Sequence, residues 1–272
     1  MKWQIKIIME SKKNGRAMKR KQKAIAIFIA YNAEKTLREF YKNFPKRYFD
    51  DIILVDDASK DNTFNLAKKL GIRSFQNPVN LGYGGNLKRA ICIALQLGAD
   101  ILVDIHPDGE YKASAIPEAL KKVKSGSQFV LGNRFTTFLG PVRSGMFIWK
   151  LLPIKILNWI DQLVLGVELG DFHQGFRVYT RTMLERINFL ENSNDYLFSF
   201  EIIAQAVFRK VKISQVPVET VYKGNKRGIR LKHVLAYSIS MFIILWQFIL
   251  AKHGWPSKIF EKPKEDLNKA VF

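Results

Sequence analysis

Cysteine is almost absent from this chain, and so are the structures that cysteines build. Cys92 is the only cysteine among 272 residues, which excludes an intrachain disulfide framework and a zinc site made of several cysteines. It lies within an apolar run, where a free cysteine is normally a buried and unreactive side chain. We therefore expect a protein of a reducing compartment such as the cytoplasm, without a cysteine nucleophile.

Several short motifs are also missing. The sequence contains no P-loop, no dinucleotide-binding glycine fingerprint, and no RRM, KH or helix-turn-helix signature. The apolar patch within residues 5–9 is too short for the core of a signal peptide, and basic residues follow it. We expect no nucleic-acid partner and no secretion signal, and we interpret residues 1–23 as a basic arm.

Acidic residues are scarce relative to basic ones, and the imbalance is uneven along the chain. The sequence has 44 Lys and Arg against 24 Asp and Glu, a formal net charge of +20. Residues 1–23 carry nine Lys or Arg and one Glu, whereas residues 221–260 carry seven and no acid. Basic ends of this kind suit either nucleic acid or an anionic membrane.

The residues that follow the second basic stretch favour the membrane. Val234–Ala251 is strongly apolar, and basic residues beside an apolar helix are typical of an anionic membrane face. The segment is at the short limit for crossing a bilayer, so we predict a peripheral or in-plane helix. The alternative is that it packs on the domain. The predicted organisation is a basic arm (1–23), a domain (24–222) and a membrane-associating segment (223–272).

Apolar runs of strand length alternate with helical patterns from residue 24 onwards. This alternation predicts an α/β fold, with a mostly parallel sheet and helices on both faces. In such sheets, ligands bind beyond the carboxyl ends of the strands. The predicted strands are Ala24–Ala30, Ile52–Val55, Ile72–Phe75, Ile101–Val103 and Phe129–Leu131; the predicted helix caps are Asn32 and either Ser59 or Asp61, with Gly71 as a helix end.

The second half is less regular. Pro153 interrupts an apolar, aromatic segment that we interpret as a kinked helix, and Pro217 suggests an edge strand. The predicted elements are a helix at Met146–Leu165, a polar loop at Asp171–Arg177, a helix at Tyr196–Phe208 and a strand at Lys212–Val221.

Polar residues gather where the predicted strands end. Asp56 and Asp57 follow one strand, and an Asp at this position can accept hydrogen bonds from a nucleoside. His106, Asp108 and Glu110 follow the strand that ends at Asp104 and could hold Mg²⁺ or Mn²⁺. The alternative is a set of ordinary turns, because Pro-Asp-Gly is a common turn sequence. The glycines of residues 80–86 precede a helix and suit either a phosphate cradle or a tight loop.

These pieces occur in one order, and that order resembles family 2 glycosyltransferases, in particular the branch similar to dolichol-phosphate mannosyltransferases. The similarity covers about residues 24–222. The matching segments are IAYNAEKTL (29–37), LVDDASKDNT (54–63), NLGYGGNLKRA (80–90), GADILVDIHPDGEY (98–111), IPEAL (116–120), LGNRF (131–135), GDFHQGFRVYTR (170–181) and VPVETVY (216–222).

The resemblance implies a GT-A fold, which is a Rossmann-like nucleotide-binding sheet beside an acceptor site. It also implies roles for particular residues. The nucleotide would be held by Tyr31, Asn32, Asp56, Asp57, Asn86 and Lys88; the metal by Asp108 with Glu110 and His106; and the acceptor side would be lined by Arg134, Gln174 and Arg177, with Asp108, Arg134 and Asp171 as catalytic residues.

Two departures from the family pattern affect these expectations. His106 stands where the family usually has the first Asp of Asp-x-Asp, which leaves the choice of metal open. Ile29 and Ala33 stand where the family often has a Pro before the Tyr-Asn pair and a Glu after it.

The reaction implied is a single displacement with inversion at the sugar's anomeric carbon. The branch and the basic ends favour a polyprenyl or dolichyl phosphate acceptor at the inner face of the membrane, with or without a membrane subunit. The alternatives are a soluble, glycan or protein acceptor, or a catalytically silent nucleotide-sugar-binding protein. A hydroxyl acceptor would need a general base, for which Asp171 and His173 are the candidates, whereas a phosphate would not.

Overall fold

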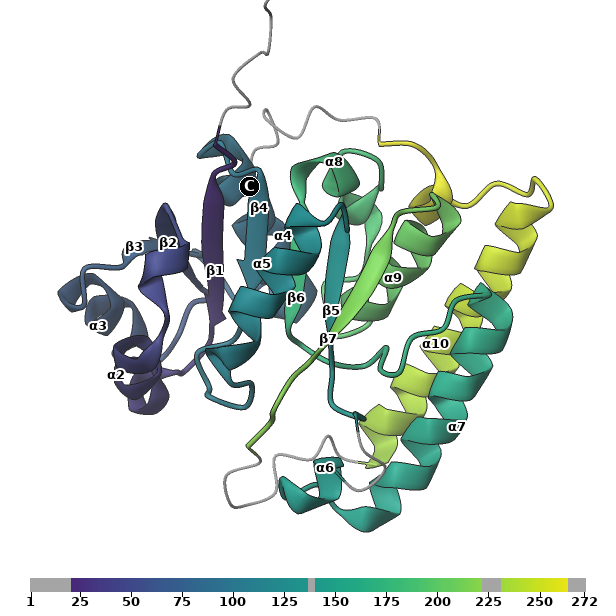
Figure 1. The fold of residues 1–272 in the computed structure, drawn as a ribbon, viewed down its shortest axis with the longest axis horizontal. Coiled ribbons are helices and arrows are strands. Elements are labelled where there is room, and N and C mark those ends of the chain that lie inside the picture. Colours follow the sequence, from purple (N-terminus) through teal and green to yellow (C-terminus); the bar gives the residue numbers. More distant parts are fainter. Residues whose placement is uncertain (1–20, 137–139, 222–230, 264–272) are drawn as a thin grey trace, which may run out of the picture.

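A computed structural model describes residues 21–136, 140–221 and 231–263 of the chain (Figure 1). Within these residues, seven strands form one sheet in the order β3-β2-β1-β4-β6-β5-β7. The strands are β1 (Ala24–Ala30), β2 (Asp51–Asp56), β3 (Arg73–Gln76), β4 (Ile101–Asp104), β5 (Phe129–Asn133), β6 (Arg177–Thr180) and β7 (Ile213–Pro217).

Helices and short 3₁₀ turns connect the strands. They are α2 (Glu34–Asn43), η1 (Lys46–Tyr48), α3 (Thr63–Lys69), α4 (Gly82–Gln96), η2 (Ala113–Ala115), α5 (Ile116–Lys124), α6 (Gly140–Arg143), α7 (Ile148–Leu165), α8 (Arg181–Leu184), η3 (Phe189–Glu191), α9 (Phe198–Phe208), α10 (Leu231–Lys252) and η4 (Lys258–Phe260).

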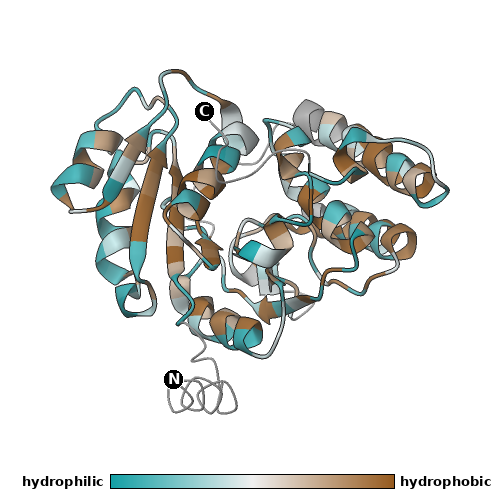
Figure 2. Ribbon diagram, turned by 90° about the horizontal axis from the view of Figure 1, so that it is seen from above, coloured by the Kyte–Doolittle hydropathy of each residue, from teal (hydrophilic) through white to brown (hydrophobic). Residues whose placement is uncertain are grey.

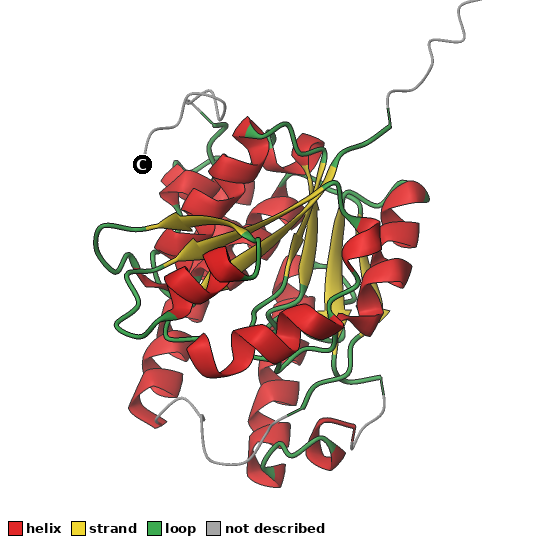
Figure 3. Ribbon diagram, turned by 90° about the vertical axis from the view of Figure 1, so that its left-hand side faces the viewer, coloured by secondary structure: helices red, strands yellow, loops and turns green. Residues whose placement is uncertain are grey.

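Strand β1 forms at the centre because all seven of its residues are apolar and buried. Its side chains alternate between two cores, as the pleat of a strand requires. Ile27 belongs to the core under α4, α9 and α10, whereas Phe28 belongs to the core under α2, α3 and α5. Hydrophobic residues fill the central strands in Figure 2, and helices cover both faces of the sheet in Figure 3. The predicted α/β architecture is confirmed.

Strand β6 is a feature that the sequence analysis missed. It runs antiparallel to both of its neighbours, while the other pairs in the described sheet are parallel. Asp104 at the end of β4 lies opposite Arg177 at the start of β6. The loop that precedes β6 therefore lies at the carboxyl end of β4. The pattern of residues 171–177 predicts a polar loop and no strand after it, because Arg177 continues that loop and leaves only Val178 and Tyr179 as an apolar pair.

Of the predicted helix caps, Asn32 does not cap its helix, whereas Asp61 and Gly71 lie at helix ends as predicted. Helix α2 begins after Ala33 without a side-chain cap, because Asn32 takes the left-handed conformation (φ 52°) and accepts a hydrogen bond from the backbone N–H of Lys60 at 2.9 Å. Asp61 does bind the start of α3, since it accepts from the N–H of Thr63 at 3.0 Å. Gly71, with φ 74°, follows the end of α3 as predicted.

The apolar C-terminal segment forms α10, which lies beside α7 and α9 at one edge of the molecule (Figure 1). One side of α10 is part of the core, through Met241, Ile244, Leu245 and Phe248. Among the described helices, none is long and apolar enough to cross a membrane. Packing on the domain, which was the alternative interpretation, therefore describes this side of the helix. The basic arm, apart from residues 21–23, and residues 222–230 lie outside the described residues.

Candidate active site

The order of the strands reverses between β1 and β4. From β1 the chain proceeds to β2 and β3 on one side, whereas β4 lies on the other side. Ligands of open α/β sheets bind at such a reversal. The turns after β1, β2 and β4 meet there with the end of β5 and the loop before β6, and these segments carry almost all of the predicted site residues.

The turns after β1 and β2 are joined by hydrogen bonds. Ser59 Oγ accepts from the N–H of Asn32 at 2.8 Å and also bonds to the Asp56 carboxylate. Asp56 is fully buried and accepts from Gln76 Nε2 at 3.0 Å. Tyr31, in contrast, is 48% exposed. The structure thus brings Tyr31, Asn32 and Asp56 together, as a nucleoside site requires; their binding role stays a prediction.

Asp57 and Asn86 are buried and hold the loop after β3. Asp57 Oδ1 accepts from Asn77 Nδ2 at 2.6 Å and from the N–H of Leu81 at 2.8 Å. Asn86 donates to the carbonyl of Val55 at 3.0 Å. These contacts give both residues a structural task, and a nucleotide-binding role for either stays a prediction.

The glycine-rich start of α4 receives another part of the chain. The N–H of Gly84 donates to the Asn194 carbonyl at 2.8 Å, and a Cβ at Gly84 would lie 2.3 Å from the Ser193 carbonyl oxygen. Lys88 donates to Asn194 Oδ1 at 2.9 Å and to the carbonyl of Asn192, and burial lowers its pKa. In this conformation the glycines permit a close approach of residues 192–195. The predicted contact of Lys88 with a nucleotide would require these bonds to break.

Two carboxylates follow β4 in the turn that was predicted to bind metal. Asp108 Oδ1 accepts from the N–H of Glu110 at 2.9 Å. Burial raises the pKa of Glu110, and the negative charge of Asp108 raises it further. A bound cation would relieve this repulsion.

His106 points toward a buried cluster below that turn. Its Nε2 lies 3.8 Å from Asp104 Oδ1, and its ring meets Tyr83 edge-on with centroids 5.5 Å apart. Asp104 is fully buried, and this burial raises its pKa. The structure therefore places His106 near Asp104, and its role as a metal ligand stays a prediction.

Arg177 and Gln174 are more deeply placed than an acceptor contact would suggest. The guanidinium of Arg177 is buried and donates to Tyr83 OH at 3.2 Å. Burial lowers the pKa of Arg177, but Tyr83, Tyr179 and Asp104 outweigh it and the net shift is upward. Gln174 is also buried, and its Nε2 has no hydrogen-bond partner among the described residues. Acceptor binding by either side chain stays a prediction.

Arg134, at the end of β5, is held by a fork of hydrogen bonds. Its Nε donates to Asp171 Oδ2 at 2.7 Å, and its Nη2 donates to Asp171 Oδ1 at 3.0 Å and to the His173 carbonyl at 2.9 Å. The positive charge of Arg134 also acts to lower the pKa of Glu110, against the larger effect of burial. The structure thus brings together Arg134, Asp171 and the acidic turn.

The two candidate bases are both committed to other groups. Asp171 is fully buried, and each of its oxygens accepts from Arg134. His173 Nδ1 lies 2.9 Å from Tyr237 OH, and its Nε2 lies 3.1 Å from Asp161 Oδ2. Asp161 and Tyr237 were not among the predicted site residues. The available signal was a single acid in the apolar segment 146–165 and the three hydroxyl residues Tyr237, Ser238 and Ser240 within the apolar stretch 234–251.

A sequence comparison identifies the family. Residues 25–187, more than half of the chain, match the profile described as glycosyl transferase family 2. This chain is a family 2 glycosyltransferase. The resemblance noted in the sequence is therefore confirmed.

Among the relatives of this glycosyltransferase is the UDP-N-acetylglucosamine–dolichyl-phosphate N-acetylglucosaminyltransferase of Methanococcus voltae. The two are 28% identical over 215 residues, which cover 72% of this chain and 84% of the relative. The polyprenol monophosphomannose synthase of Mycolicibacterium smegmatis is 27% identical over 175 residues, covering 61% and 65%. The first name describes transfer to dolichyl phosphate, and the second describes the synthesis of polyprenol monophosphomannose.

Solved structures confirm the GT-A-like fold of this glycosyltransferase. Glucosyl-3-phosphoglycerate synthase from Mycobacterium tuberculosis, in complex with uridine diphosphate, superimposes with a TM-score of 0.62. The match covers 87% of this chain and 82% of that protein, at 19% sequence identity.

A divalent metal fits the acidic turn of this glycosyltransferase. Within the described part of the chain, no three His, Cys, Asp or Glu side chains form a complete metal-binding group. Mg²⁺, however, is commonly held by one or two carboxylates together with substrate phosphates. Asp108 and Glu110 supply two carboxylates on one turn, with the mutual repulsion that a cation relieves.

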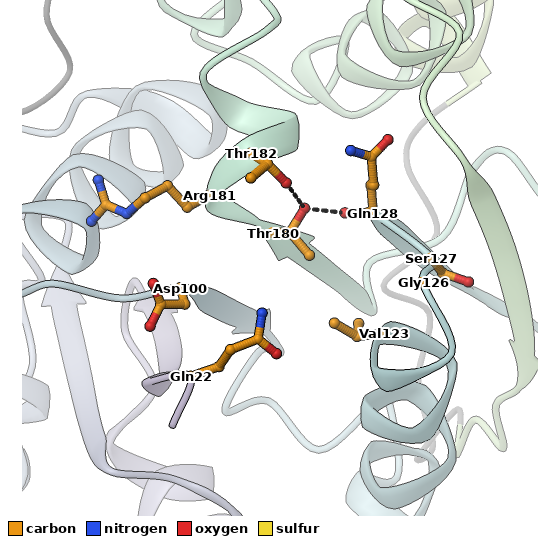
Figure 4. A pocket seen from close by; sticks show the side chains of 9 residues that line it. All are labelled: Gln22, Asp100, Val123, Gly126, Ser127, Gln128, Thr180, Arg181 and Thr182. Atoms are coloured by element: carbon orange, nitrogen blue, oxygen red, sulfur yellow. Dashed lines mark hydrogen bonds between the residues drawn. The ribbon is translucent and has the colours of Figure 1, made fainter. Parts of the chain in front are cut away.

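A pocket lies at the other ends of the strands, away from the candidate active site (Figure 4). Its polar side chains already bind backbone groups, since Arg181 Nε donates to the Ala99 carbonyl at 2.9 Å and Thr180 Oγ1 to the Gln128 carbonyl at 2.8 Å. It therefore belongs to the scaffold. It is lined by Gln22, Asp100, Val123, Gly126, Ser127, Gln128, Thr180, Arg181 and Thr182.

Proposed function

We propose that this glycosyltransferase moves a sugar from a nucleoside-diphosphate donor to a polyprenyl phosphate, with inversion at the anomeric carbon. The observation that carries the proposal is that both candidate bases already have partners: Asp171 accepts from Arg134, and His173 Nδ1 is hydrogen-bonded to Tyr237 while its Nε2 lies 3.1 Å from the Asp161 carboxylate. A hydroxyl acceptor would need one of them free. A phosphate acceptor is already anionic at neutral pH, because its second pKa is about 6. The names of two relatives point to the same class of acceptor.

The site residues would act by binding and orientation. Tyr31, Asn32 and Asp56 would hold the nucleoside, and Asp108 with Glu110 would hold Mg²⁺ or Mn²⁺. When bound, the metal would neutralise the charge that develops on the departing diphosphate. A related fold has been solved with Mn²⁺ and uridine diphosphate bound, which supports a divalent metal without choosing between the two ions.

The transfer itself requires no proton movement on the protein. An oxygen of the acceptor phosphate forms the new bond to the anomeric carbon, and the bond from that carbon to the donor's diphosphate breaks. The nucleoside diphosphate leaves with the electron pair. Arg134 is fixed by Asp171 and by the His173 carbonyl, and it would hold phosphate oxygens in place while this exchange occurs.

The cellular setting that suits such an acceptor is the cytoplasmic face of a membrane. The net charge of +20 and the basic stretch that precedes α10 favour peripheral association with anionic lipid. Association with a membrane subunit is compatible with the same position.

The test is release of nucleoside diphosphate by the purified full-length chain. The protein is incubated with Mg²⁺ or Mn²⁺ and with UDP-N-acetylglucosamine, UDP-glucose or GDP-mannose, with and without polyprenyl phosphate. We expect rapid release only when metal, one donor and the lipid are all present, and Asp108→Asn should abolish it. Release that is the same without lipid, or faster with a soluble acceptor such as 3-phosphoglycerate, would contradict the lipid acceptor.

A further inference from the structure

Helix α7 presents its apolar side to the outside of the molecule. Five of its large apolar side chains are 48–69% exposed, and they recur at intervals of three or four residues, which places them on one side of a helix. They are Ile148, Leu152, Ile156, Trp159 and Leu163. A surface helix of a water-soluble domain normally has the opposite arrangement.

The inward side of α7 carries polar groups that hold the loop before β6. Asn158 is buried; it donates to the Gly170 carbonyl at 3.1 Å and accepts from the N–H of Phe172 at 3.3 Å. Asp161 is fully buried and lies 3.1 Å from His173 Nε2. The same loop fixes Arg134. Helix α7 therefore packs inward through core residues such as Leu151 and Leu165 together with the polar Asn158 and Asp161, and it presents a second set of apolar side chains outward.

Helix α10 repeats this outward apolar pattern next to α7. Its exposed residues are 44–62% accessible and spaced by three, one and three positions, again on one side of a helix, while Met241 and Phe248 lie in the core. The two helices run side by side in the same direction at one edge of the molecule (Figure 1). Together with the five residues of α7, the exposed residues Ile239, Phe242, Ile243 and Trp246 make up what we call the α7–α10 apolar face.

The charges on these two helices indicate which partner would cover this face. The only acid in α7 is Asp161, which is buried, and α10 contains no acid. The two helices contribute four lysines, and residues 223–230 just before α10 add four more basic residues. Exposed tryptophans between lysines are typical of helices that lie in an anionic bilayer interface. A second protein copy would give no reason for this excess of positive charge.

We propose that the α7–α10 apolar face is the surface by which the protein docks on an anionic lipid bilayer, with α7 joining the bilayer to the acceptor loop. The inference deepens the proposed function, on which its purpose rests, because a polyprenyl phosphate can be reached only from the bilayer. It adds α7 to the single segment that the sequence analysis had assigned to the membrane.

The experiment measures flotation with vesicles that contain no polyprenyl phosphate. The full chain is mixed either with phosphatidylglycerol–phosphatidylcholine vesicles or with pure phosphatidylcholine vesicles. We expect binding to the mixed vesicles, and at least about tenfold weaker binding for the α7 variant Trp159→Glu/Leu163→Glu, since two inserted apolar groups become charged. The control is Val79→Glu, which changes a side chain that is 59% exposed in the loop after β3, at the other edge of the sheet. It should bind like the wild type.

Two further measurements keep the result unambiguous. Thermal unfolding followed by circular dichroism should be unchanged in the α7 variant, because both altered residues are exposed. Light scattering should find the same mass for both proteins. The proposal would be overturned if the α7 variant bound vesicles as strongly as the wild type. This includes the case in which the wild type is a dimer and the variant is a monomer with unchanged vesicle binding. The assay contains no donor or acceptor, so docking without sugar transfer to polyprenyl phosphate would refute the proposed function alone.

Discussion

At the scale of single residues, the pair formed by Arg134 and Asp171 determines how the site can work. Both side chains are buried, and two parallel hydrogen bonds of 2.7 and 3.0 Å join them. Bidentate pairs of this kind fix the direction of the guanidinium. Asp171 therefore looks like a base in the sequence but is placed as a positioning residue for Arg134.

We predict that Asp171→Asn and Arg134→Lys each lower kcat/KM by about 100-fold, and that the double variant loses little more than either single one. Residues that act as a unit show such non-additive losses. The pH profile of Asp171→Asn should keep the shape of the wild-type profile, because a positioning residue contributes no proton-transfer step. Steady-state kinetics across pH measure both effects.

The control for this experiment is the exposed pair of Lys112 and Glu219, whose atoms lie 2.5 Å apart. Glu219→Gln should change kcat/KM and stability very little, since exposed ion pairs contribute only about 0–1 kcal/mol. If the two losses at Arg134 and Asp171 are additive, or if Asp171→Asn removes one limb of the pH profile, Asp171 is a base and the positioning role is wrong.

Other residue-level expectations depended on partners that no local pattern reveals. Asp56 and Asp108 could be placed at the site because each follows a predicted strand, whereas Arg134 was assigned by the family resemblance alone. Lys88 was predicted from its motif alone, but its ammonium binds Asn194, which is 106 positions away in the chain. A long-range contact of this kind becomes visible only in the folded molecule.

At the scale of elements, the structure links α7, α10 and the loop before β6 through one buried cluster. The His173 ring lies between Asp161 of α7 and Tyr237 of α10. The apolar and aromatic composition of residues 146–165 correctly predicted a helix there. It could not reveal that Asn158 and Asp161 face inward while several large apolar side chains face outward, because the orientation depends on what surrounds the helix. Strand β6 was missed for a different reason, since its first residue continues a polar loop and only Val178 and Tyr179 form an apolar pair.

We predict that Asp161 makes the protein less stable as pH rises through the acidic range. Burial raises the pKa of this carboxyl above its ordinary value of 3.8. At pH values between the pKa of Asp161 in the unfolded chain and its higher pKa in the folded protein, the folded state binds more protons than the unfolded state. The free energy of unfolding therefore falls as pH rises. Asp161→Asn removes this titration, and its stability should therefore fall less steeply with pH. Urea unfolding at several pH values from about 3.8 upward measures the slopes.

Tyr237→Phe is the matched control, because it alters the same cluster without removing a carboxyl. It should cost about 1 kcal/mol through the lost hydrogen bond to His173 and keep the wild-type slope. Identical slopes for Asp161→Asn and the wild type would mean that Asp161 keeps its ordinary pKa in the folded protein.

At the scale of the whole molecule, the order of motifs along residues 24–222 was enough to predict the family and the mostly parallel sheet. The prediction of a helix in the C-terminal segment is confirmed, and its association with a membrane stays a prediction. What the sequence left open was the relation of this segment to the domain, because the same apolar residues suit a lipid surface and a protein core. In α10 one side serves the core and the other is exposed.

The last prediction concerns this dual use of the C-terminal segment. Deleting residues 223–272 should prevent folding, even though the family match ends at residue 187. Six large apolar side chains would be lost from the core, at about 1.5–3 kcal/mol each, compared with a total stability of about 5–15 kcal/mol for a typical domain. Gln205 and Arg209 of the remaining chain would also lose their bonds to backbone carbonyls of η4, at 2.5 and 2.6 Å. The six side chains are Met241, Ile244, Leu245, Phe248, Ile259 and Phe260.

The measurement is calorimetric unfolding of the 1–222 fragment beside a 1–263 fragment. The longer fragment should give a cooperative transition close to that of the full chain, and the shorter one should give none or remain insoluble. A cooperative transition in the shorter fragment would place the domain boundary at residue 222. Failure of the shorter fragment alone would mean that α10 is needed for the fold itself. Loss of membrane binding after a C-terminal deletion would then say nothing about lipid contact. For this reason the outward-facing side chains of α7 and α10 have to be changed while the side chains that face the core are kept.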